Sequence, residues 1–333
     1  MTITVIERIN NLLRKANYET LLLGDFATKK SKFCFDLLVK KDDLIFSVKV
    51  FPNIDNVNPD LIRDIKSLSM ILKSKPLLIG LRNRYQKLED NTIYVRNGLP
   101  FITLNTLEYI LTSNIYPHIL ARRGGGVVFL DGNLMRELRE QQLITRKEFS
   151  EKLGITKRTV SSYENESMRP SEEMSQKILN VLEDKEIFKQ INIFKWNIQY
   201  DIEDKDSDEG KELSEFESQV QTIINDLGLS SYWYKKGSIP FKLSLFSSFN
   251  KGESDNFYPL FSAVSEEQGN VNEMNFNCLK MFNDLFHKTA LYIIDNNIKI
   301  PGSIKGKDIH IVKIKNLEEV DDEEEFIELI QES

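Results

Sequence analysis

Apolar residues recur at two different spacings in the N-terminal third of the chain. Residues 7–16 (ERINNLLRKA) and 61–74 (LIRDIKSLSMILKS) carry them at the spacing of an amphipathic helix. Residues 32–39 (KFCFDLLV) and 44–51 (LIFSVKVF) are β-rich runs joined by the polar turn KKDD. The later runs PLLIGL and NTIYV add two strands, and FITLNTLEYILTS adds a final helix. The pattern predicts a mixed α/β unit.

Short amphipathic helices replace this pattern after residue 131. The run GNLMRELREQQ carries its apolar residues at helical spacing and predicts the first helix. Thr145 followed three residues later by Glu148 is a capping box, which starts a second helix. Gly154 supplies a left-handed stop, so this second helix is short.

A third helix is predicted after Gly154, with Thr156 as its N-cap. Val160 and Tyr163 lie three residues apart and share the face that points to the core. A fourth helix follows Pro170 and Ser171 in SEEMSQKILNVLE. The third helix leaves a polar face near its start, made of Lys157, Arg158, Thr159, Ser161 and Ser162.

Two short helices joined by a tight turn, the second with polar residues at its start, are typical of a helix-turn-helix. Lysine and arginine can donate to guanine acceptors in the major groove, and hydroxyls can reach base edges or phosphates. An alternative reading of the spacing alone is a solvated helix in a small bundle.

The last third of the chain echoes the first. FESQVQTIINDLG parallels the opening helix, FKLSLFSSF and NFYPLFSAVS suggest a hairpin, and NCLKMFNDLFHKTALYIID reads as helix then strand. We therefore expect a diverged structural repeat, although many α/β units share this order of elements.

Composition breaks the chain into five parts. ARRGGG predicts a flexible connector with a cationic arm at Arg122 and Arg123, and DIEDKDSDEG predicts a second, acidic linker. The expected parts are an α/β domain (1–120), an Arg/Gly-rich linker (121–131), a helix-turn-helix domain (132–190), an acidic linker (191–212) and a second α/β domain (213–333).

Charge is unevenly distributed along the 333 residues. The net charge is −7, but much of the negative charge lies in residues 201–210 and 317–328, while residues 139–158 are rich in Lys and Arg. A cationic face is therefore compatible with an acidic chain. The acidic run LEEVDDEEEFIELI is a candidate surface for a protein partner, or a solvated helix face.

The sequence gives little support for a metal site, a disulfide bond or a membrane-spanning segment. Cys34 and Cys278 each lie in an apolar segment, and the histidines 118, 287 and 310 are isolated from other ligands. No apolar run is long enough to span a membrane. We expect a cytoplasmic, nucleoid-associated protein with no cofactor. SSYWYKKG combines aromatics with lysines as single-strand binders do, but its aromatics are more typical of core.

The central segment resembles the Cro and lambda-repressor-like (XRE) helix-turn-helix family over its full length, in LRE, EKLGI, TVSSYEN and the late RPS. The whole chain is also similar to a group of archaeal helix-turn-helix transcriptional regulators. The resemblance implies that Arg146 and Lys147, at the start of the second helix, contact phosphate or base edges. It makes base readers of Lys157, Arg158, Thr159, Ser161 and Ser162. The family's usual glutamine, alanine and glycine are replaced here by Arg146, Ser150 and Glu166.

The N-terminal unit is similar to the restriction-endonuclease-like fold of archaeal Holliday-junction resolvases. Active members hold a metal with an aspartate on one strand and an acidic-x-lysine on the next. Asp36 and Lys49 match the outer places, whereas Ser47 replaces the middle carboxylate and is a poor ligand for a hard cation. The expected protein is thus an all-α lambda-repressor-like bundle between two related, inactive nuclease-like α/β domains, binding double-stranded DNA as a homodimer. A metal-dependent nuclease and an architectural DNA-binding protein are the alternatives.

Overall fold

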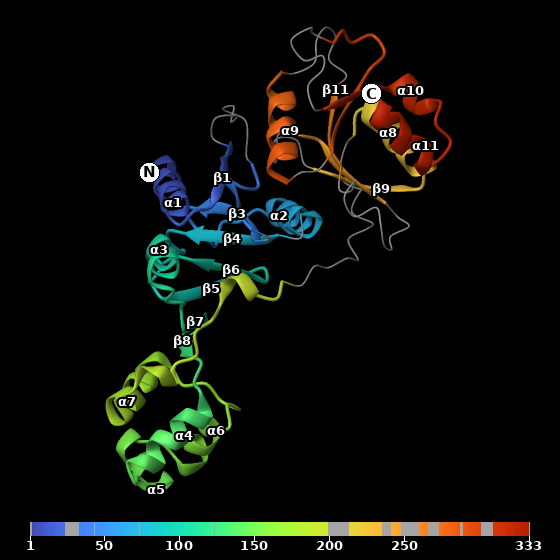
Figure 1. Cartoon of the computed structure of the whole chain (residues 1–333). Coiled ribbons are helices and arrows are strands. Elements are labelled where there is room, and N and C mark those ends of the chain that lie inside the picture. The colour runs from blue at the N-terminus through green and yellow to red at the C-terminus, as the bar shows by residue number, and fades with distance from the viewer. Residues whose placement is uncertain are drawn as a thin grey trace. The chain divides into compact units, whose positions relative to one another are not determined.

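A computed structural model describes residues 2–23, 33–42, 44–72, 74–122, 124–198, 213–234, 241–247, 260–265, 273–286, 289–300 and 309–332 (Figure 1). The chain divides into two compact units, each built from separate stretches of sequence. One comprises Met1–Asn17, Lys49–Val57 and Leu77–Gln199, and the other Tyr18–Val48, Asn58–Pro76 and Tyr200–Ser333.

The first sheet has the strand order β1-β2-β3-β4-β6-β5-β7-β8. Strands β1 to β3 are antiparallel, and β4 is parallel to β6. Asp42 takes the left-handed conformation (φ 51°) in the turn between β2 and β3, which an aspartate tolerates. Its strands are β1 (Glu19–Leu22), β2 (Leu37–Lys41), β3 (Leu44–Phe51), β4 (Lys75–Gly80), β5 (Thr92–Arg96), β6 (Leu99–Ile102), β7 (Ile119–Arg122) and β8 (Gly125–Val128), with helices α1 (Thr2–Lys15), α2 (Pro59–Ile71) and α3 (Leu104–Ser113).

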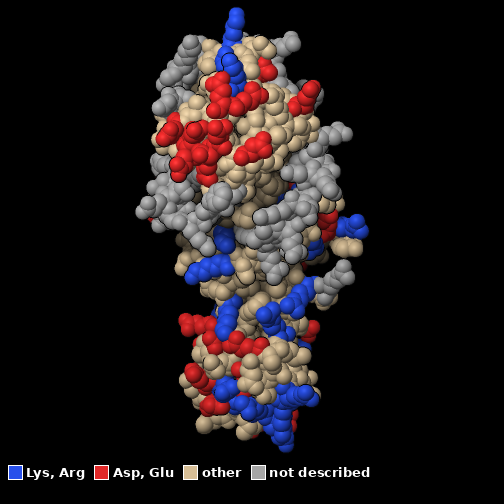
Figure 2. Space-filling view, turned by 90° about the vertical axis from the view of Figure 1, so that its right-hand side faces the viewer, with Lys and Arg blue, Asp and Glu red and all other residues tan. Residues whose placement is uncertain are grey.

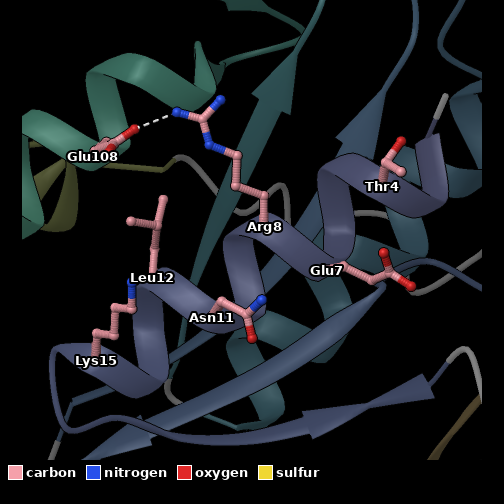
Figure 3. A pocket seen from close by; sticks show the side chains of 7 residues that line it. All are labelled: Thr4, Glu7, Arg8, Asn11, Leu12, Lys15 and Glu108. Atoms are coloured by element: carbon pink, nitrogen blue, oxygen red, sulfur yellow. Dashed lines mark hydrogen bonds and ion pairs between the residues drawn. The ribbon is translucent and has the colours of Figure 1, made fainter.

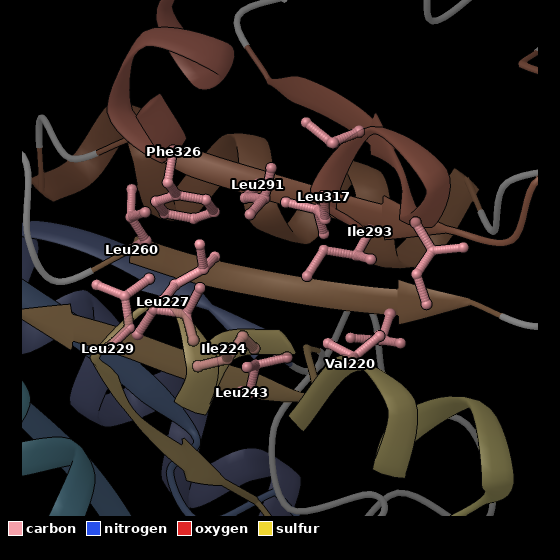
Figure 4. Packing of buried hydrophobic residues seen from close by; sticks show 14 of the residues in the cluster. Val220, Ile224, Leu227, Leu229, Leu243, Leu260, Leu291, Ile293, Leu317 and Phe326 are labelled. Atoms are coloured by element: carbon pink, nitrogen blue, oxygen red, sulfur yellow. The ribbon is translucent and has the colours of Figure 1, made fainter. Parts of the chain in front are cut away.

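The second sheet has the order β13-β12-β11-β10-β9 and a dry core (Figure 4). On its strands, Leu243, Leu260, Leu291 and Ile293 are fully buried. Helices α8 and α11 cover them with Val220 and Phe326. Its elements are α8 (Glu215–Asp226), β9 (Leu229–Trp233), β10 (Leu243–Ser247), β11 (Leu260–Ser265), α9 (Glu273–Phe286), β12 (Ala290–Ile294), β13 (His310–Lys313), α10 (Ile314–Glu318) and α11 (Glu323–Glu332).

The two sheets share an order of elements. In each, a helix precedes three antiparallel strands, a second helix follows, and parallel strands and a further helix come next. The expected antiparallel hairpin is confirmed as β10 and β11. Residues 248–259, which join these strands, lie outside the described residues.

The acidic C-terminal run forms the outer face of two helices. Leu317, Phe326 and Ile330 are buried, whereas the carboxylates between them are mostly exposed. Figure 2 shows Asp and Glu side chains gathered on this part of the surface. A role for this face in binding a protein remains a prediction, and the acidic residues 201–210 lie outside the described part of the chain.

Contacts within the second unit join segments that are far apart in sequence. Lys40 Nζ donates to the Leu285 carbonyl (3.0 Å), and Tyr232 Oη donates to Asp64 Oδ1 (3.0 Å). Burial, followed by the Asp64 charge, raises the pKa of Tyr232, so its hydroxyl keeps the donated proton. The contiguous domain boundaries 1–120 and 213–333 remain a prediction.

The expectation of a flexible connector at the glycine run is wrong. Strands β7 and β8 form an antiparallel hairpin with Arg122 opposite Gly125. Gly124 (φ 91°) and Gly125 (φ 127°) adopt the left-handed geometry of the turn, so the glycines fold the chain back here. Leu130 bridges to Phe188, and Ile119 and Val128 pack into the core of the following helices, which orders the connection. Arg123 lies outside the described residues.

Candidate nucleic-acid interface

Four short helices follow the hairpin, as predicted. They are α4 (Gly132–Gln141), α5 (Arg146–Leu153), α6 (Lys157–Glu164) and α7 (Glu172–Leu182). Val160 is 0% exposed and Tyr163 is 6% exposed, so the predicted inward face of α6 is confirmed. They share a core with Met135, Phe149 and Ile178.

Local sequence signals fix the ends of α5 and α6. The Thr145 hydroxyl accepts from the Glu148 amide (3.2 Å), and the Glu148 carboxylate accepts from the Thr145 amide (2.8 Å). These two hydrogen bonds are the predicted capping box. The Thr145 amide and the Thr145 hydroxyl both donate to the Glu148 carboxylate, and these two bonds lower the pKa of Glu148. Gly154 ends α5 in the left-handed conformation (φ 69°), and Thr156 caps α6.

The outer face of α6 presents two cations. Lys157 and Arg158 are exposed and form no salt bridge with any residue that the structure describes. Lys147 and Lys152 on α5 are also exposed, and Lys147 lies only 4.0 Å from Glu151 in a solvated pair. Figure 2 shows Lys and Arg side chains gathered over this bundle. A local cationic surface therefore exists on the acidic chain.

The predicted hydroxyl readers are half-buried and partly occupied within the helix. The Thr159 hydroxyl lies 2.9 Å from the Thr156 hydroxyl, and Ser161 Oγ accepts from Asn165 Nδ2 (3.4 Å). The carbonyl of Ser162 accepts from the Ser167 amide (3.0 Å), which turns the chain after α6. Lys157 and Arg158 are therefore more accessible to an external ligand than the three hydroxyls are.

Arg146 is tied to the bundle by a carboxylate that the sequence analysis did not single out. Its Nε donates to Glu164 Oε2 at 2.7 Å, and its side chain is 46% exposed. Arg139 Nε donates to Glu164 Oε1, also at 2.7 Å, and Arg136 Nε lies 3.6 Å from the same carboxylate. The Glu164 side chain is 0% exposed and that of Arg139 is 5% exposed. One buried carboxylate therefore ties α4 and the start of α5 to α6.

Two departures from the family pattern have local explanations. Ser150, in place of alanine, is buried, and its hydroxyl donates to the Lys147 carbonyl (2.7 Å). Glu166, in place of glycine, takes the left-handed conformation (φ 57°). Its carboxylate accepts from the Gly132 amide at the start of α4 (3.2 Å) and from Lys189 Nζ (2.6 Å), and these contacts lower its pKa. The side chain thus offsets the backbone cost of replacing glycine.

A second cationic surface lies at the hairpin. Arg122 is exposed at the end of β7, and the Arg169 guanidinium stacks on the Phe129 ring, 3.7 Å from its centroid. Burial and then the nearby Arg122 charge lower the pKa of Arg169. Arg169 was missed from sequence because only the folded hairpin brings Phe129 beneath it.

The candidate nuclease residues lie on neighbouring strands. The Asp36 amide donates to the Val48 carbonyl (2.7 Å) just before β2, and Ser47 on β3 is 3% exposed. Lys49 follows on β3. Within the described ranges, no group of three His, Cys, Asp or Glu side chains could hold a metal ion.

Among the residues that the structure describes, no helix is both long and apolar enough to cross a membrane.

A shallow hollow lies between α1 and α3 (Figure 3). Its volume is about 380 Å³, and Arg8 Nη2 pairs across it with Glu108 (2.6 Å). Glu7, Asn11 and Lys15 complete a mixed-charge lining. Arg8 is paired and the lining holds no histidine or cysteine, so we assign no reaction to this hollow.

Comparison with known families agrees with the geometry of the bundle and the sheet. Residues 135–187 match a helix-turn-helix family, and residues 2–117 match a PD-(D/E)XK superfamily domain. The chain therefore contains an XRE-type helix-turn-helix domain and a nuclease-like domain, which confirms the resemblance drawn from sequence.

Several archaeal relatives are named as transcriptional regulators, and two of those reported match over nearly the full length. A protein of Archaeoglobus fulgidus named "Putative HTH-type transcriptional regulatory protein" is 29% identical over 332 residues, covering 100% of this chain and 98% of its own length. A protein of the same type from Methanocaldococcus jannaschii is 27% identical, covering 90% of this chain and 88% of its own length. One from Methanobrevibacter smithii is 32% identical, covering 63% and 65%. No solved structure matches the chain.

The contacts of Glu166 predict an order of stability among its variants. Glu166→Ala removes the bond to the Gly132 amide and keeps the left-handed strain, so it should destabilise the bundle by roughly 1–2 kcal/mol. Glu166→Gly loses the same bond but relieves the strain, so it should be the more stable of the two. Hydrogen exchange of the α4 and α6 amides measures the difference.

The matched control is Glu173→Ala on α7, where the carboxylate is 81% exposed and pairs with Lys177 (2.9 Å). It should leave exchange in α4 unchanged. An alanine variant at least as stable as the glycine variant would contradict the assigned strain at residue 166.

Proposed function

We propose that this protein is a sequence-specific transcription regulator that binds double-stranded DNA with α6 in the major groove. The observation that carries the proposal is the two-sided burial of α6. Val160 and Tyr163 are packed inward, while Lys157 and Arg158 project to solvent without a carboxylate partner among the described residues. The family match over residues 135–187 and the regulator names of the relatives support it.

Distinct roles follow for the cationic residues. We assign base reading to Lys157 and Arg158, with Thr159, Ser161 and Ser162 completing the face. Exposed Lys147 suits phosphate contact at the start of α5, and Arg122 suits contact beyond it. Arg146 has one nitrogen committed to Glu164, so we assign it to orienting α6, with its remaining guanidinium nitrogens available to a phosphate.

Homodimerisation is part of the proposal. One helix-turn-helix reads only a few base pairs, and twofold pairing on an inverted repeat doubles the site. The proposed dimer acts in the cytoplasm at the nucleoid, and footprinting that shows half-sites about one helical turn apart would support it.

We further propose that the flanking regions are two related nuclease-like domains without catalytic activity. Their shared order of strands supports the repeat. When the β10–β11 pair is compared with the β2–β3 pair, Lys242 takes the position before β10 that Asp36 takes before β2. The Lys242 ammonium pairs with Glu217. Ser47 supplies a neutral, buried hydroxyl where a metal site needs charge.

Alanine replacement of the proposed readers tests the DNA-binding role. Lys157→Ala and Arg158→Ala should each weaken binding to the footprinted operator by about 1–3 kcal/mol for each lost bidentate base contact. Fluorescence anisotropy with operator duplex measures the change. Lys177→Ala on α7 is the control, because this exposed lysine is paired with Glu173 (2.9 Å). If both reader variants bind as wild type does, these side chains do not read the operator.

The rival nuclease function has a direct assay, and the PD-(D/E)XK match is the observation that favours it. We expect no cleavage of linear or branched DNA with magnesium or manganese beyond that of Asp36→Ala, because the middle carboxylate is a serine. Cleavage by the wild type that disappears in Asp36→Ala would establish an enzyme instead.

A further inference from the structure

A cationic loop between β4 and β5 holds an aromatic side chain in water. Tyr85 is 87% exposed, so its side chain contributes little to the core. Arg82, Arg84 and Lys87 surround it in sequence and are exposed. None of these three forms a salt bridge with a residue in the described part of the chain.

The loop is ordered by its own hydrogen bonds. Arg82 and Lys87 form an antiparallel bridge at its base. At the tip, the Asn83 Oδ1 atom accepts from the amides of Tyr85 and Gln86, both at 2.8 Å. The ring of Tyr85 is therefore displayed on a fixed turn, which reduces the entropy lost when a ligand binds.

Asp55 fixes the loop to the body of the unit. Its Oδ2 atom accepts from the Arg84 amide (2.8 Å), and its Oδ1 atom accepts from Arg96 Nε (2.6 Å). Burial raises the pKa of Asp55, but these hydrogen bonds and the charges of Arg96 and Arg84 outweigh it and leave the pKa below its usual range. Asp55 is therefore charged at neutral pH. It binds the backbone amide of Arg84, and the Arg84 side chain is exposed.

Two carboxylates close to the loop accept hydrogen bonds from neutral side chains. Glu89 accepts from Gln86 Nε2 (3.2 Å), and Asp90 accepts from Asn105 Nδ2 (3.0 Å) and from the Thr103 hydroxyl. No described carboxylate forms an ion pair with Arg82, Arg84 or Lys87, although the Arg84 charge acts on nearby Asp55, so the three cations can meet an external anion.

A flat apolar ring among unpaired cations matches the chemistry of an unpaired nucleotide. The base offers a face for stacking and the phosphates offer negative charge. A duplex hides its base faces in the stack, so it could use the cations but not the ring. We propose that residues 81–88 bind single-stranded DNA, with Tyr85 stacked on a base and Arg82, Arg84 and Lys87 on phosphates.

The other aromatic-basic segment of the chain cannot take this role. In residues 230–237, Trp233 is 2% exposed and Tyr234 is 4% exposed, and both belong to the core. Tyr85 is instead 87% exposed.

Anisotropy titration of a labelled oligothymidine with the full chain tests the loop. Tyr85→Ala should weaken binding by about 5- to 150-fold, the range for loss of one base–aromatic stack. Tyr85→Phe keeps the ring and should bind close to wild type. Lys87→Ala should reduce the magnitude of the slope of log K against log salt concentration by about 0.7, because one phosphate contact is lost. Circular dichroism should be unchanged, because Tyr85 is 87% exposed.

The double variant Lys157→Ala/Arg158→Ala separates this site from the helix-turn-helix. It should keep oligothymidine binding, whereas Tyr85→Ala should keep duplex binding. The loop assignment is overturned if wild type does not bind oligothymidine, if Tyr85→Ala binds it as wild type does, if Tyr85→Phe is as weak as Tyr85→Ala, or if the double variant loses it. Each of these results is readable even if no operator is found.

Discussion

A single buried carboxylate organises the DNA-binding helices of this protein. Glu164 has no exposed side-chain surface and accepts from Arg139 and Arg146, with Arg136 nearby. Burying a carboxylate is expensive, and the cost is offset only when its oxygens meet well-placed donors. The arginines come from α4 and from the start of α5, so satisfying the carboxylate fixes the position of α6. The proposed recognition face depends on that position.

Close packing adds a second constraint on α6. A β-carbon at Gly132 would lie 2.2 Å from the Glu164 carbonyl oxygen, so the start of α4 and the end of α6 approach more closely than any other residue permits. Glu166, just beyond, caps the Gly132 amide. Charge, packing and capping therefore meet at the end of α6 that lies away from Lys157 and Arg158. Its other end is the one that we propose contacts DNA.

Features with a local signature could be predicted from the sequence. The capping box at Thr145, the stop at Gly154 and the inward pair Val160 and Tyr163 depend on residues within a few positions of one another, and the structure has all of them. The Glu164 cluster could not be predicted in this way, because Arg139 lies 25 residues away and a pairing across helices has no spacing rule.

The glycine run was misread for a related reason. Consecutive glycines favour flexibility in isolation, but apolar neighbours such as Val128 pack into the helical core and select the hairpin. The exposed tyrosine at residue 85 also escaped sequence reasoning, since exposure of an aromatic residue is decided by the turn that holds it. In each case a tertiary contact determined the outcome.

Hydrogen exchange of Glu164→Ala, combined with duplex binding, tests the central claim most directly. Removing the carboxylate deletes the charged hydrogen bonds from Arg139 and Arg146, at about 1.5–3 kcal/mol each, and leaves the buried Arg139 with Glu140 (3.0 Å) and the Ile144 carbonyl (2.8 Å). The account predicts that amides of α4 and α6 exchange about a hundredfold faster or more, and that duplex binding weakens with them. Unchanged protection of α6, with duplex binding equal to wild type, would contradict the claim that this buried charge positions the recognition helix.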